Sequence, residues 1–382
     1  MHKQGRDRRK EGNGMSSKLG FGLMRLPRLE DGSIDIEQSS RMVDIFIEGG
    51  GTYFDTAFVY DGSEEATKKI LVDRYPRESY TLATKANTGA ATKDEEGTKK
   101  QLYTSLERTG AGYFDYYLLH SLMSGNVDAH KNFGMWDYMA RKKEEGLIKH
   151  YGFSFHDGPE LLDKLLTEHP DVEFVQLQIN YADWENEEIR AKENYAVARQ
   201  HGKQIVIMEP VKGGTLATLP EEAETVLKKL DPEASIASWA LRYAASLDGI
   251  LAALSGMSTI AQVEDNISFM GEGRFKPLSK KEKEAVEEVR AILAKRRQIG
   301  CTACGYCLEG CPMNINIPGC FSAFNQFLRF GNPVTAQNRY RMRTRDKGKA
   351  SECIFCGACE GVCPQHLPIR DLLAELAPIL ET

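Results

Sequence analysis

Eight of the nine cysteines form two copies of one spacing pattern in the last quarter of the chain. Each copy reads C-x2-C-x2-C-x3-C-P. The first is Cys301, Cys304, Cys307 and Cys311 before Pro312, and the second is Cys353, Cys356, Cys359 and Cys363 before Pro364. Three thiolates spaced by two residues can wrap one cube-shaped 4Fe–4S cluster, and the proline then turns the chain so that the fourth thiolate can reach another. The spacing therefore predicts two 4Fe–4S clusters.

The crossed arrangement assigns four cysteines to each cluster. The first cluster is predicted to bind Cys301, Cys304, Cys307 and Cys363, and the second Cys353, Cys356, Cys359 and Cys311. A structural zinc ion would leave the third cysteine of each copy over, and a disulfide framework conflicts with a cytoplasmic protein. The segment resembles a ferredoxin-like 4Fe–4S dicluster domain, and the helical pattern of Pro318–Phe330 favours the helical type. The ninth cysteine, Cys320, fits a small buried apolar side chain.

A second set of reactive side chains lies in the first third of the chain, and it consists of Asp55, Tyr60, Lys85 and His120. Asp55, Lys85 and His120 each end a segment rich in β-branched and aromatic residues. Tyr60 follows Asp55 in the next loop. In a barrel of parallel strands, side chains at the carboxyl ends of the strands meet on one face. We therefore expect these four side chains to lie together.

These four residue types can act together as a proton donor. A tyrosine hydroxyl has a pKa near ~10 and becomes a usable acid near neutral pH only beside a positive charge. Lys85 can supply that charge, and Asp55 can hold Lys85 in place. His120 can orient a substrate carbonyl by a hydrogen bond. The set predicts carbonyl chemistry with Tyr60 as the general acid.

At these residues the chain resembles the aldo-keto reductases, whose tetrad of Asp, Tyr, Lys and His matches Asp55, Tyr60, Lys85 and His120. The resemblance covers roughly Lys18 to Met270. It implies a (β/α)8 barrel that uses NADPH or NADH to interconvert carbonyls and alcohols.

The resemblance also implies a set of cofactor-binding residues. They are Gly22, Met24, Asp55, Ser154, Gln176, Met208, Val211, Gly256, Met257, Ser258, Gln262, Asp265 and Asn266. Ser154 and Gln176 match residues that bind the carboxamide of the nicotinamide. Asp265 and Asn266 match an acid–Asn pair that holds the adenine. The backbone N–H groups of Gly256–Ser258, before a predicted helix, can bind phosphate.

The chain departs from the family pattern at three of these contacts. Phe155 stands where an Asn usually follows the serine, and Met208 stands where an aromatic residue often stacks on the nicotinamide. Gln262 replaces the Arg that often binds the 2′-phosphate of NADPH. Because this replacement removes a charge-assisted contact, both NADPH and NADH stay open.

Strand-like and helix-like segments alternate along the chain, which is typical of an α/β fold with parallel strands. Eight strands are predicted near Leu19–Met24, Thr52–Ala57, Tyr80–Lys85, Tyr113–His120, Ile148–Phe155, Phe174–Tyr181, Gln204–Val211 and Gly249–Gly256. Predicted helices include Ile36–Glu48, Asn132–Glu145 and Ser235–Leu247. The strand count supports a (β/α)8 barrel independently of the resemblance.

Three parts are predicted along the chain: a barrel over residues 1–275, a linker helix over 276–298 and a small, mainly helical two-cluster domain over 299–382. Ser279 and Glu282 can form a capping box at the start of the linker helix. Arg8–Ser17 is predicted as a β-hairpin that closes the floor of the barrel.

The composition narrows the class of protein. The chain has 382 residues, 27% of them charged, and a net charge of −6, which argues against a nucleic-acid binder. No apolar run approaches the ~18 residues that a membrane span needs. No apolar segment follows the basic N-terminal residues, so they do not form a secretory signal. A cytoplasmic protein without a membrane partner is expected.

The two halves suggest different electron chemistry. Hydride transfer moves two electrons, whereas each cluster passes one, so an exchange between nicotinamide and cluster usually needs a flavin. No flavin signature is present, but flavin contacts in such barrels are mostly made by the backbone, so a flavin stays open.

We expect a carbonyl oxidoreductase coupled to or capped by an iron–sulfur domain, which acts on a small carbonyl or alcohol. The alternative is an electron-transfer or redox-sensing protein with the barrel as scaffold. Structural clusters that only shape the substrate pocket are a third hypothesis. The basic run Arg339–Lys349 is either a solvated loop or a docking patch for a redox partner protein.

Overall fold

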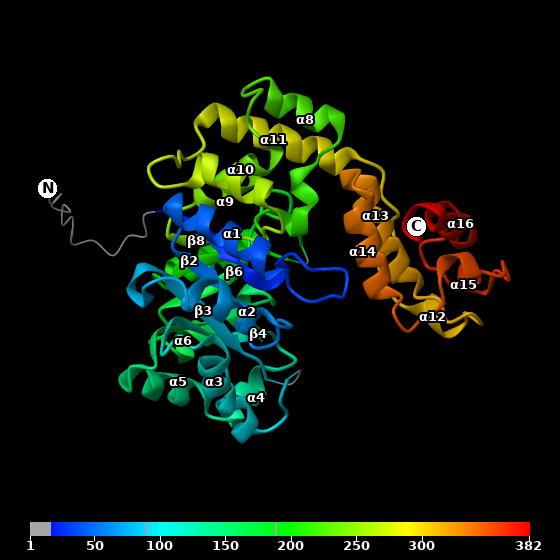
Figure 1. The fold of residues 1–382 in the computed structure, drawn as a ribbon. Helices are drawn as coiled ribbons and strands as arrows, with labels where there is room; N and C mark the ends of the chain where they lie inside the picture. The colour runs from blue at the N-terminus through cyan, green and yellow to red at the C-terminus, as the bar shows by residue number, and fades with distance from the viewer. Residues whose placement is uncertain (1–16, 89–90, 188) are drawn as a thin grey trace, which may run out of the picture. The chain divides into compact units, whose positions relative to one another are not determined.

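Figure 1 shows the chain in a computed structural model that describes residues 17–88, 91–187 and 189–382. Of the β-hairpin predicted over Arg8–Ser17, all but the last residue lies outside the described residues. By its contacts the chain forms two compact units. The first holds the chain up to Gln178 together with Lys192–Met208 and Leu247–Lys276, and the second holds Ile179–Ala191, Glu209–Ser246 and Pro277–Thr382. The division predicted at residues 275 and 298 remains a prediction.

The first unit contains a closed barrel of eight parallel strands in sequence order. The strands are β1 (Leu19–Gly22), β2 (Tyr53–Asp55), β3 (Thr81–Ala86), β4 (Phe114–Leu122), β5 (Ile148–Phe155), β6 (Phe174–Gln178), β7 (Gln204–Met208) and β8 (Ile250–Ser255). All eight predicted strands are present, and the predicted (β/α)8 architecture is confirmed. Large buried side chains such as Tyr53, Leu118 and Phe174 fill the barrel interior, so it is a packed core.

Helices follow most of the strands. In the first unit they are α1 (Ile36–Glu48), α2 (Ser63–Thr67), α3 (Glu95–Thr109), α4 (Val127–Asn132), α5 (Met135–Glu144), α6 (Pro159–Glu168), α7 (Ala191–Gln200) and α10 (Ile260–Met270). Asp35 caps α1 by accepting a hydrogen bond from the backbone N–H of Gln38. Phe46 of α1 packs against Phe21 and Phe54, with ring centroids 5.3 and 5.1 Å away. These aromatic contacts attach α1 to β1 and β2.

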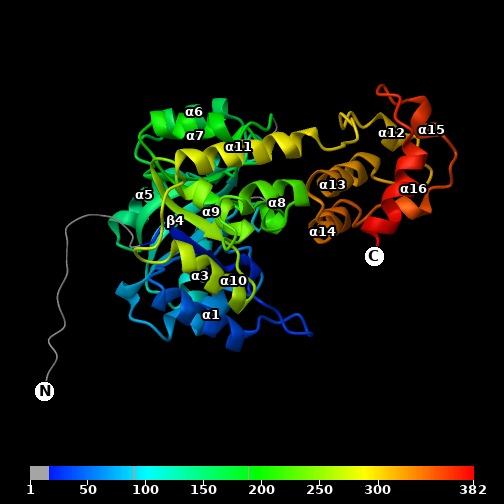
Figure 2. The ribbon, with the colours of Figure 1, turned by 90° about the horizontal axis from the view of Figure 1, so that it is seen from above.

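The second unit is helical. It contains α8 (Glu221–Lys228), α9 (Ile236–Ala245), α11 (Lys280–Lys295), α12 (Tyr306–Glu309), α13 (Ile317–Phe330), α14 (Pro333–Arg343), α15 (Ala358–Gly361) and α16 (Ile369–Leu380). The capping box predicted from Ser279 and Glu282 is present at the start of α11. Helices α13, α14 and α16 pack against one another (Figure 2). Within the described ranges no helix is long and apolar enough to span a membrane.

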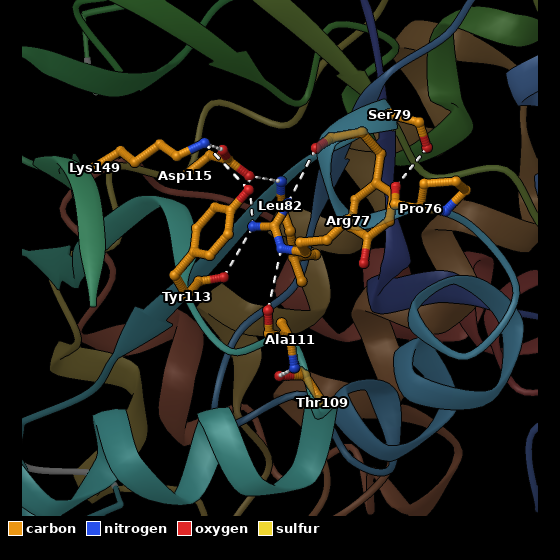
Figure 3. Close-up of polar contacts among 10 residues, drawn as sticks. Pro76, Arg77, Ser79, Leu82, Thr109, Ala111, Tyr113, Asp115 and Lys149 are labelled. Carbon is orange, nitrogen blue, oxygen red and sulfur yellow. Dashed lines mark hydrogen bonds and ion pairs between the residues drawn. The ribbon is translucent and has the colours of Figure 1, made fainter. Parts of the chain in front are cut away.

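A polar network ties three strands together at their amino ends, opposite the ends that carry the predicted catalytic residues (Figure 3). Asp115 of β4 accepts from Arg77 Nη2 at 2.7 Å, from Lys149 Nζ at 2.9 Å and from the backbone N–H of Leu82 at 2.9 Å. The Asp115 side chain is 10% exposed. Arg77 also donates to the backbone oxygens of Tyr80 and Tyr113. Through Leu82 and Lys149, the carboxylate of Asp115 joins β3 and β5 to its own strand, β4.

Replacing Asp115 by Ala should lower the free energy of unfolding by about 3 kcal/mol, because it leaves the half-buried Arg77 guanidinium without its carboxylate. Urea denaturation measures the change. The matched control is Glu95→Gln, which removes the ion pair between Glu95 and Lys99. The Glu95 side chain is 56% exposed. The control should cost less than about 1 kcal/mol. Equal costs for the two variants would contradict a structural role for the network.

Candidate active site and candidate metal centres

The parallel register brings the predicted catalytic strands together at their carboxyl ends. Asp55 is the last residue of β2 and pairs with Gly22 of β1 and Ala83 of β3. Lys85 is the last residue but one of β3. Both side chains are buried, with Asp55 3% and Lys85 1% exposed. Because a buried charge loses its hydration, the ion pair between Asp55 and Lys85 is needed to offset the cost of burying both groups.

Lys85 is the centre of the polar contacts. Its Nζ donates to Asp55 Oδ1 at 2.5 Å and to the backbone oxygen of Thr56 at 2.7 Å. The same Nζ lies 5.2 Å from the centroid of the Tyr60 ring. Gln176 of β6 donates from Nε2 to the other carboxylate oxygen of Asp55 at 3.3 Å. Asp55 is thus held from two sides and fixes the ammonium group beside Tyr60.

The electrostatics keep Lys85 charged. Burial lowers the pKa of Lys85, but the Asp55 carboxylate and the Tyr60 hydroxyl together raise that pKa by more, so the net shift is upward. Burial raises the pKa of Asp55, against the opposing effect of Lys85 and Gln176. A fixed positive charge beside a phenol oxygen stabilises its deprotonated form. Lys85 thus supplies the positive charge that an acidic Tyr60 needs.

His120 lies inside its strand and not at the strand end that the sequence predicted. Strand β4 continues to Leu122, with an irregularity after Leu119 where Ser121 adopts a φ of 59°. The imidazole meets the Tyr60 ring edge to face, with centroids 5.7 Å apart. Ser121, the residue with the left-handed backbone, directly follows His120 in the sequence.

The imidazole of His120 is neutral. Burial lowers the pKa of His120 to about 3, and the nearby charge of Lys85 adds to the shift. Its buried Nδ1 has no hydrogen-bond partner among the described residues. A neutral imidazole can donate one hydrogen bond, which suits the predicted role of orienting a carbonyl oxygen.

Two residues that the resemblance assigns to the carboxamide, Ser154 and Gln176, are register partners on β5 and β6. Both are buried, and each also bonds a strand that carries a predicted catalytic residue. The hydroxyl of Ser154 accepts from the backbone N–H of Ser121 at 2.7 Å, and Gln176 bonds Asp55. These contacts position the strands, while the contact of both residues to the nicotinamide stays a prediction.

Met208 and Val211 follow the seventh strand. Met208 is its last residue and pairs with Gln178 of β6. Val211 belongs to the second unit, where it precedes a short 3-10 helix, η4 (Lys212–Ala217). The strand predicted over Gln204–Val211 therefore ends three residues early, because Glu209 has a positive φ of 57°. The predicted cofactor contacts of these two residues remain predictions.

The predicted phosphate segment connects β8 to α10. Thr259 caps the helix by accepting from the backbone N–H of Gln262, and the side chain of Gln262 accepts in turn from the backbone N–H of Ser258 at 2.7 Å. Met257 is buried, whereas Asp265 is half-buried on α10.

Asn266, the partner of Asp265 in the predicted adenine contact, is buried at 4% exposure. Its side chain donates to the hydroxyl of Ser255 at 2.9 Å. Asn266 thus holds the carboxyl end of β8, and its adenine contact stays a prediction.

Sequence reasoning missed Arg25, which lies beside this segment. The hydroxyl of Ser258 donates to the backbone oxygen of Arg25 at 2.7 Å. A Cβ on Gly256 would lie 3.3 Å from the Arg25 side chain. Met24, which the resemblance assigns to cofactor binding, is 59% exposed. Arg25 follows Met24 directly in the sequence, but only the pairing of β1 with β8 shows that it lies near the phosphate segment.

The eight patterned cysteines line two separate cavities in the second unit. One cavity is lined by Cys301, Cys304, Cys307 and Cys363, and the other by Cys311, Cys353, Cys356 and Cys359. This grouping is the crossed one that the spacing predicts. Cys320 lines neither cavity and is fully buried in the apolar core of this part, as expected.

The backbone repeats itself around the two cavities. Ala303 and Phe355, each just before the second cysteine of its motif, have φ values of 55° and 56°. Asn314 and His366, three residues after the last cysteine of each motif, have φ values of 51° and 49°. Non-glycine residues rarely adopt this conformation. Their recurrence at equivalent positions indicates that both loops wrap the same kind of group.

The cavities fit clusters better than single ions. Among the described residues, no group of three or more His, Cys, Asp or Glu side chains converges closely enough to hold one metal ion. Four thiols around a cavity are instead what a cube of iron and sulfur needs. The cavities differ in one charge, because Arg370 lines the second and Pro318 takes the equivalent place in the first.

Two family models match the chain. Residues 18–291 match the aldo/keto reductase family, and residues 300–367 match the 4Fe-4S dicluster domain. The solved structure of an aldo-keto reductase from Klebsiella pneumoniae in complex with NADPH has a TM-score of 0.57 and 19% identity. It covers 72% of this chain and 90% of that one, and it shows the same barrel fold.

Two curated relatives have related names. Aldo-keto reductase str7 of Strobilurus tenacellus is 30% identical over 219 residues, which is 54% of this chain and 62% of that protein. The uncharacterized oxidoreductase YqkF of Bacillus subtilis is 24% identical over 318 residues, which is 74% of this chain and 93% of YqkF. With most of its length matched by one family model, this oxidoreductase belongs to the aldo/keto reductase family and carries a 4Fe–4S dicluster domain towards its C-terminus.

Proposed function

We propose that the protein interconverts a small carbonyl compound and its alcohol with NADPH or NADH, and that Tyr60 is the general acid and base. The observation that carries the proposal is the buried Lys85, held by Asp55 at 2.5 Å and lying 5.2 Å from the centroid of the Tyr60 ring. A barrel that served only as a scaffold would not need a desolvated ion pair beside a tyrosine, because such a pair costs stability.

When it is bound, the nicotinamide supplies the hydride that enters at the carbonyl carbon. Tyr60 gives its proton to the carbonyl oxygen and takes it back in the reverse direction. The positive charge of Lys85 stabilises the phenolate that remains, and Asp55 keeps Lys85 in place. Neutral His120 can donate a hydrogen bond to the same oxygen and so orient it. The residues present thus fit the reaction in both directions.

The nucleotide is proposed to be NADPH or NADH. A Cβ on Gly256 would lie 3.3 Å from the aliphatic part of the Arg25 side chain, and the backbone oxygen of Arg25 accepts a hydrogen bond from Ser258, so Arg25 borders the segment that is proposed to bind phosphate. The aldo-keto reductase from Klebsiella pneumoniae, which has the same barrel fold, was solved in complex with NADPH, and this supports a nicotinamide nucleotide here.

The C-terminal cavities are proposed to hold two 4Fe–4S clusters that exchange electrons with a redox partner protein. Cys304 and Cys356 are exposed, so each cavity has an edge open to solvent, where a partner can approach. All nine cysteines lie in the described residues and none forms a disulfide. Eight thiolates that bind clusters and a ninth reduced cysteine, Cys320, support a reducing, cytoplasmic environment.

An anaerobic assay tests the proposal. The purified protein is mixed with NADPH or NADH and a panel of small aldehydes and ketones, and nucleotide oxidation is recorded together with cluster absorbance and EPR. We expect nucleotide oxidation that requires a carbonyl. If nucleotide alone also reduces the clusters, a bound flavin should be sought.

A protein that oxidises neither nucleotide with any carbonyl, while its clusters cycle with a chemical reductant, would overturn the proposal. That outcome would favour the electron-transfer alternative.

A further inference from the structure

The second unit contains a cavity of about 760 Å³ to which the proposed reaction assigns no role. Small-molecule sites have volumes of about 300–1,000 Å³. The walls come from the segment after β6, from η4 and from α11, α13 and α14. Four basic and four acidic side chains line the cavity, so its formal charge is balanced.

Two of the basic side chains are already compensated. Lys212 Nζ donates to both oxygens of Asp183, each at 2.6 Å. Arg290 forms ion pairs with Glu185 at 2.7 Å and with Glu287 at 2.5 Å. Three of the four acidic side chains in the lining thus form ion pairs with Lys212 or Arg290.

Arg329, in the last turn of α13, is not compensated in this way. Among the described residues it has no ion pair, and its buried Nε has no hydrogen-bond partner. Its Nη2 makes a long contact of 3.5 Å to the backbone oxygen of Ala182, and its Cζ lies 5.3 Å from the centroid of the Phe330 ring. Asp183 attracts the guanidinium from a distance, but its carboxylate already binds Lys212.

A half-buried guanidinium without a carboxylate is unfavourable unless something else binds it. Burial lowers the pKa of Arg329, which reflects the lost hydration, yet the group stays charged. The position of Arg329 at the C-terminal end of a helix gives a favourable interaction with the helix dipole, but this effect is small compared with the desolvation of a charge. Arg329 therefore presents a charge that an anionic ligand of this cavity can bind.

We propose that this cavity binds a small organic monocarboxylate, whose two oxygens accept hydrogen bonds from the guanidinium of Arg329. The planar fork of an arginine matches a carboxylate. Because the lining as a whole is formally neutral, a single negative charge meets less repulsion from its acidic side chains than the two charges of a phosphate. Phe330, Ala291 and Ala294 offer apolar surface for the rest of the ligand.

Isothermal titration of the full, cluster-loaded protein with sodium benzoate tests this proposal. Benzoate should bind, and the neutral isostere benzamide and inorganic phosphate should each bind at least tenfold more weakly. Arg329→Met should weaken benzoate binding by about tenfold or more, because a charge-assisted pair is lost. The matched control is Arg341→Met, an exposed arginine on α14 outside the cavity, which should leave benzoate binding unchanged.

Two further measurements separate this site from the tetrad. Benzoate affinity should be the same in Tyr60→Phe, and unliganded Arg329→Met should unfold at a temperature no lower than that of the wild type. If Arg329→Met does not fold, Arg329→Lys, which keeps the charge but loses the fork, should weaken benzoate several-fold. Benzoate that does not bind, that binds equally well to the Arg329 variant, or that binds less tightly than phosphate would overturn the proposal.

Discussion

Replacing Tyr60 by Phe should lower kcat by about 10²- to 10⁴-fold, because it removes the proton that the carbonyl oxygen receives. Nucleotide affinity should change little, since the ring and its contacts to Lys85 and His120 remain. Steady-state kinetics on the best carbonyl of the panel gives kcat, and a fluorescence titration gives the Kd of NADPH. Under the proposed mechanism kcat falls and the Kd of NADPH stays the same.

The control for this variant is Tyr103→Phe, which removes the hydroxyl of a 48% exposed tyrosine in the same unit. It should leave both quantities unchanged. Lys85→Met should cost about as much as Tyr60→Phe, and the double variant little more, because residues that act as a unit are not additive. Full turnover in Tyr60→Phe would show that another group donates the proton.

Replacing Cys363 by Ser should remove the cluster of the other motif, the one that contains Cys304. The reason is that Cys363 lines the cavity with Cys301, Cys304 and Cys307. The iron content should fall by about half, from about eight to about four atoms per chain. EPR of the reduced protein should show the loss of one signal, and Cys304→Ser should lose the same signal.

Cys311→Ser should remove the remaining signal, because Cys311 lines the other cavity. The matched control is Cys320→Ser, a buried cysteine outside both cavities, which should keep the full iron content. If Cys363→Ser and Cys356→Ser instead lose the same signal, each motif binds its cluster with its own four cysteines. The crossed assignment would then be wrong.

The sequence predicted the parts whose signal is local. All eight strands and the (β/α)8 fold follow from the alternation of apolar segments with helical ones, and α1 was predicted at its observed limits, Ile36–Glu48. The spacing of the cysteines is also a local signal, because cysteines separated by two residues lie close enough together to bind one cluster. Asp55 and Lys85 were placed correctly near strand ends because the strands end where the apolar run ends.

Features that depend on pairing between distant segments could not be read in this way. His120 lies inside β4 because the strand continues to Leu122 through an irregularity in its register with β5. The bond from Gln176 to Asp55 links residues 121 positions apart. Arg25 lies near Ser258 only because β1 closes the barrel on β8.

The sequence by itself thus determined which side chains can do chemistry, because residue type and spacing along the chain fix the reacting groups and the local element. The tertiary structure alone decided which of these groups are desolvated and which charges are paired. The raised pKa of Lys85, the neutral state of His120 and the uncompensated Arg329 all result from neighbours far away in the sequence. Burial and charge pairing depend on all the groups that lie near a side chain in space, and the order of residues along the chain does not show which groups these are.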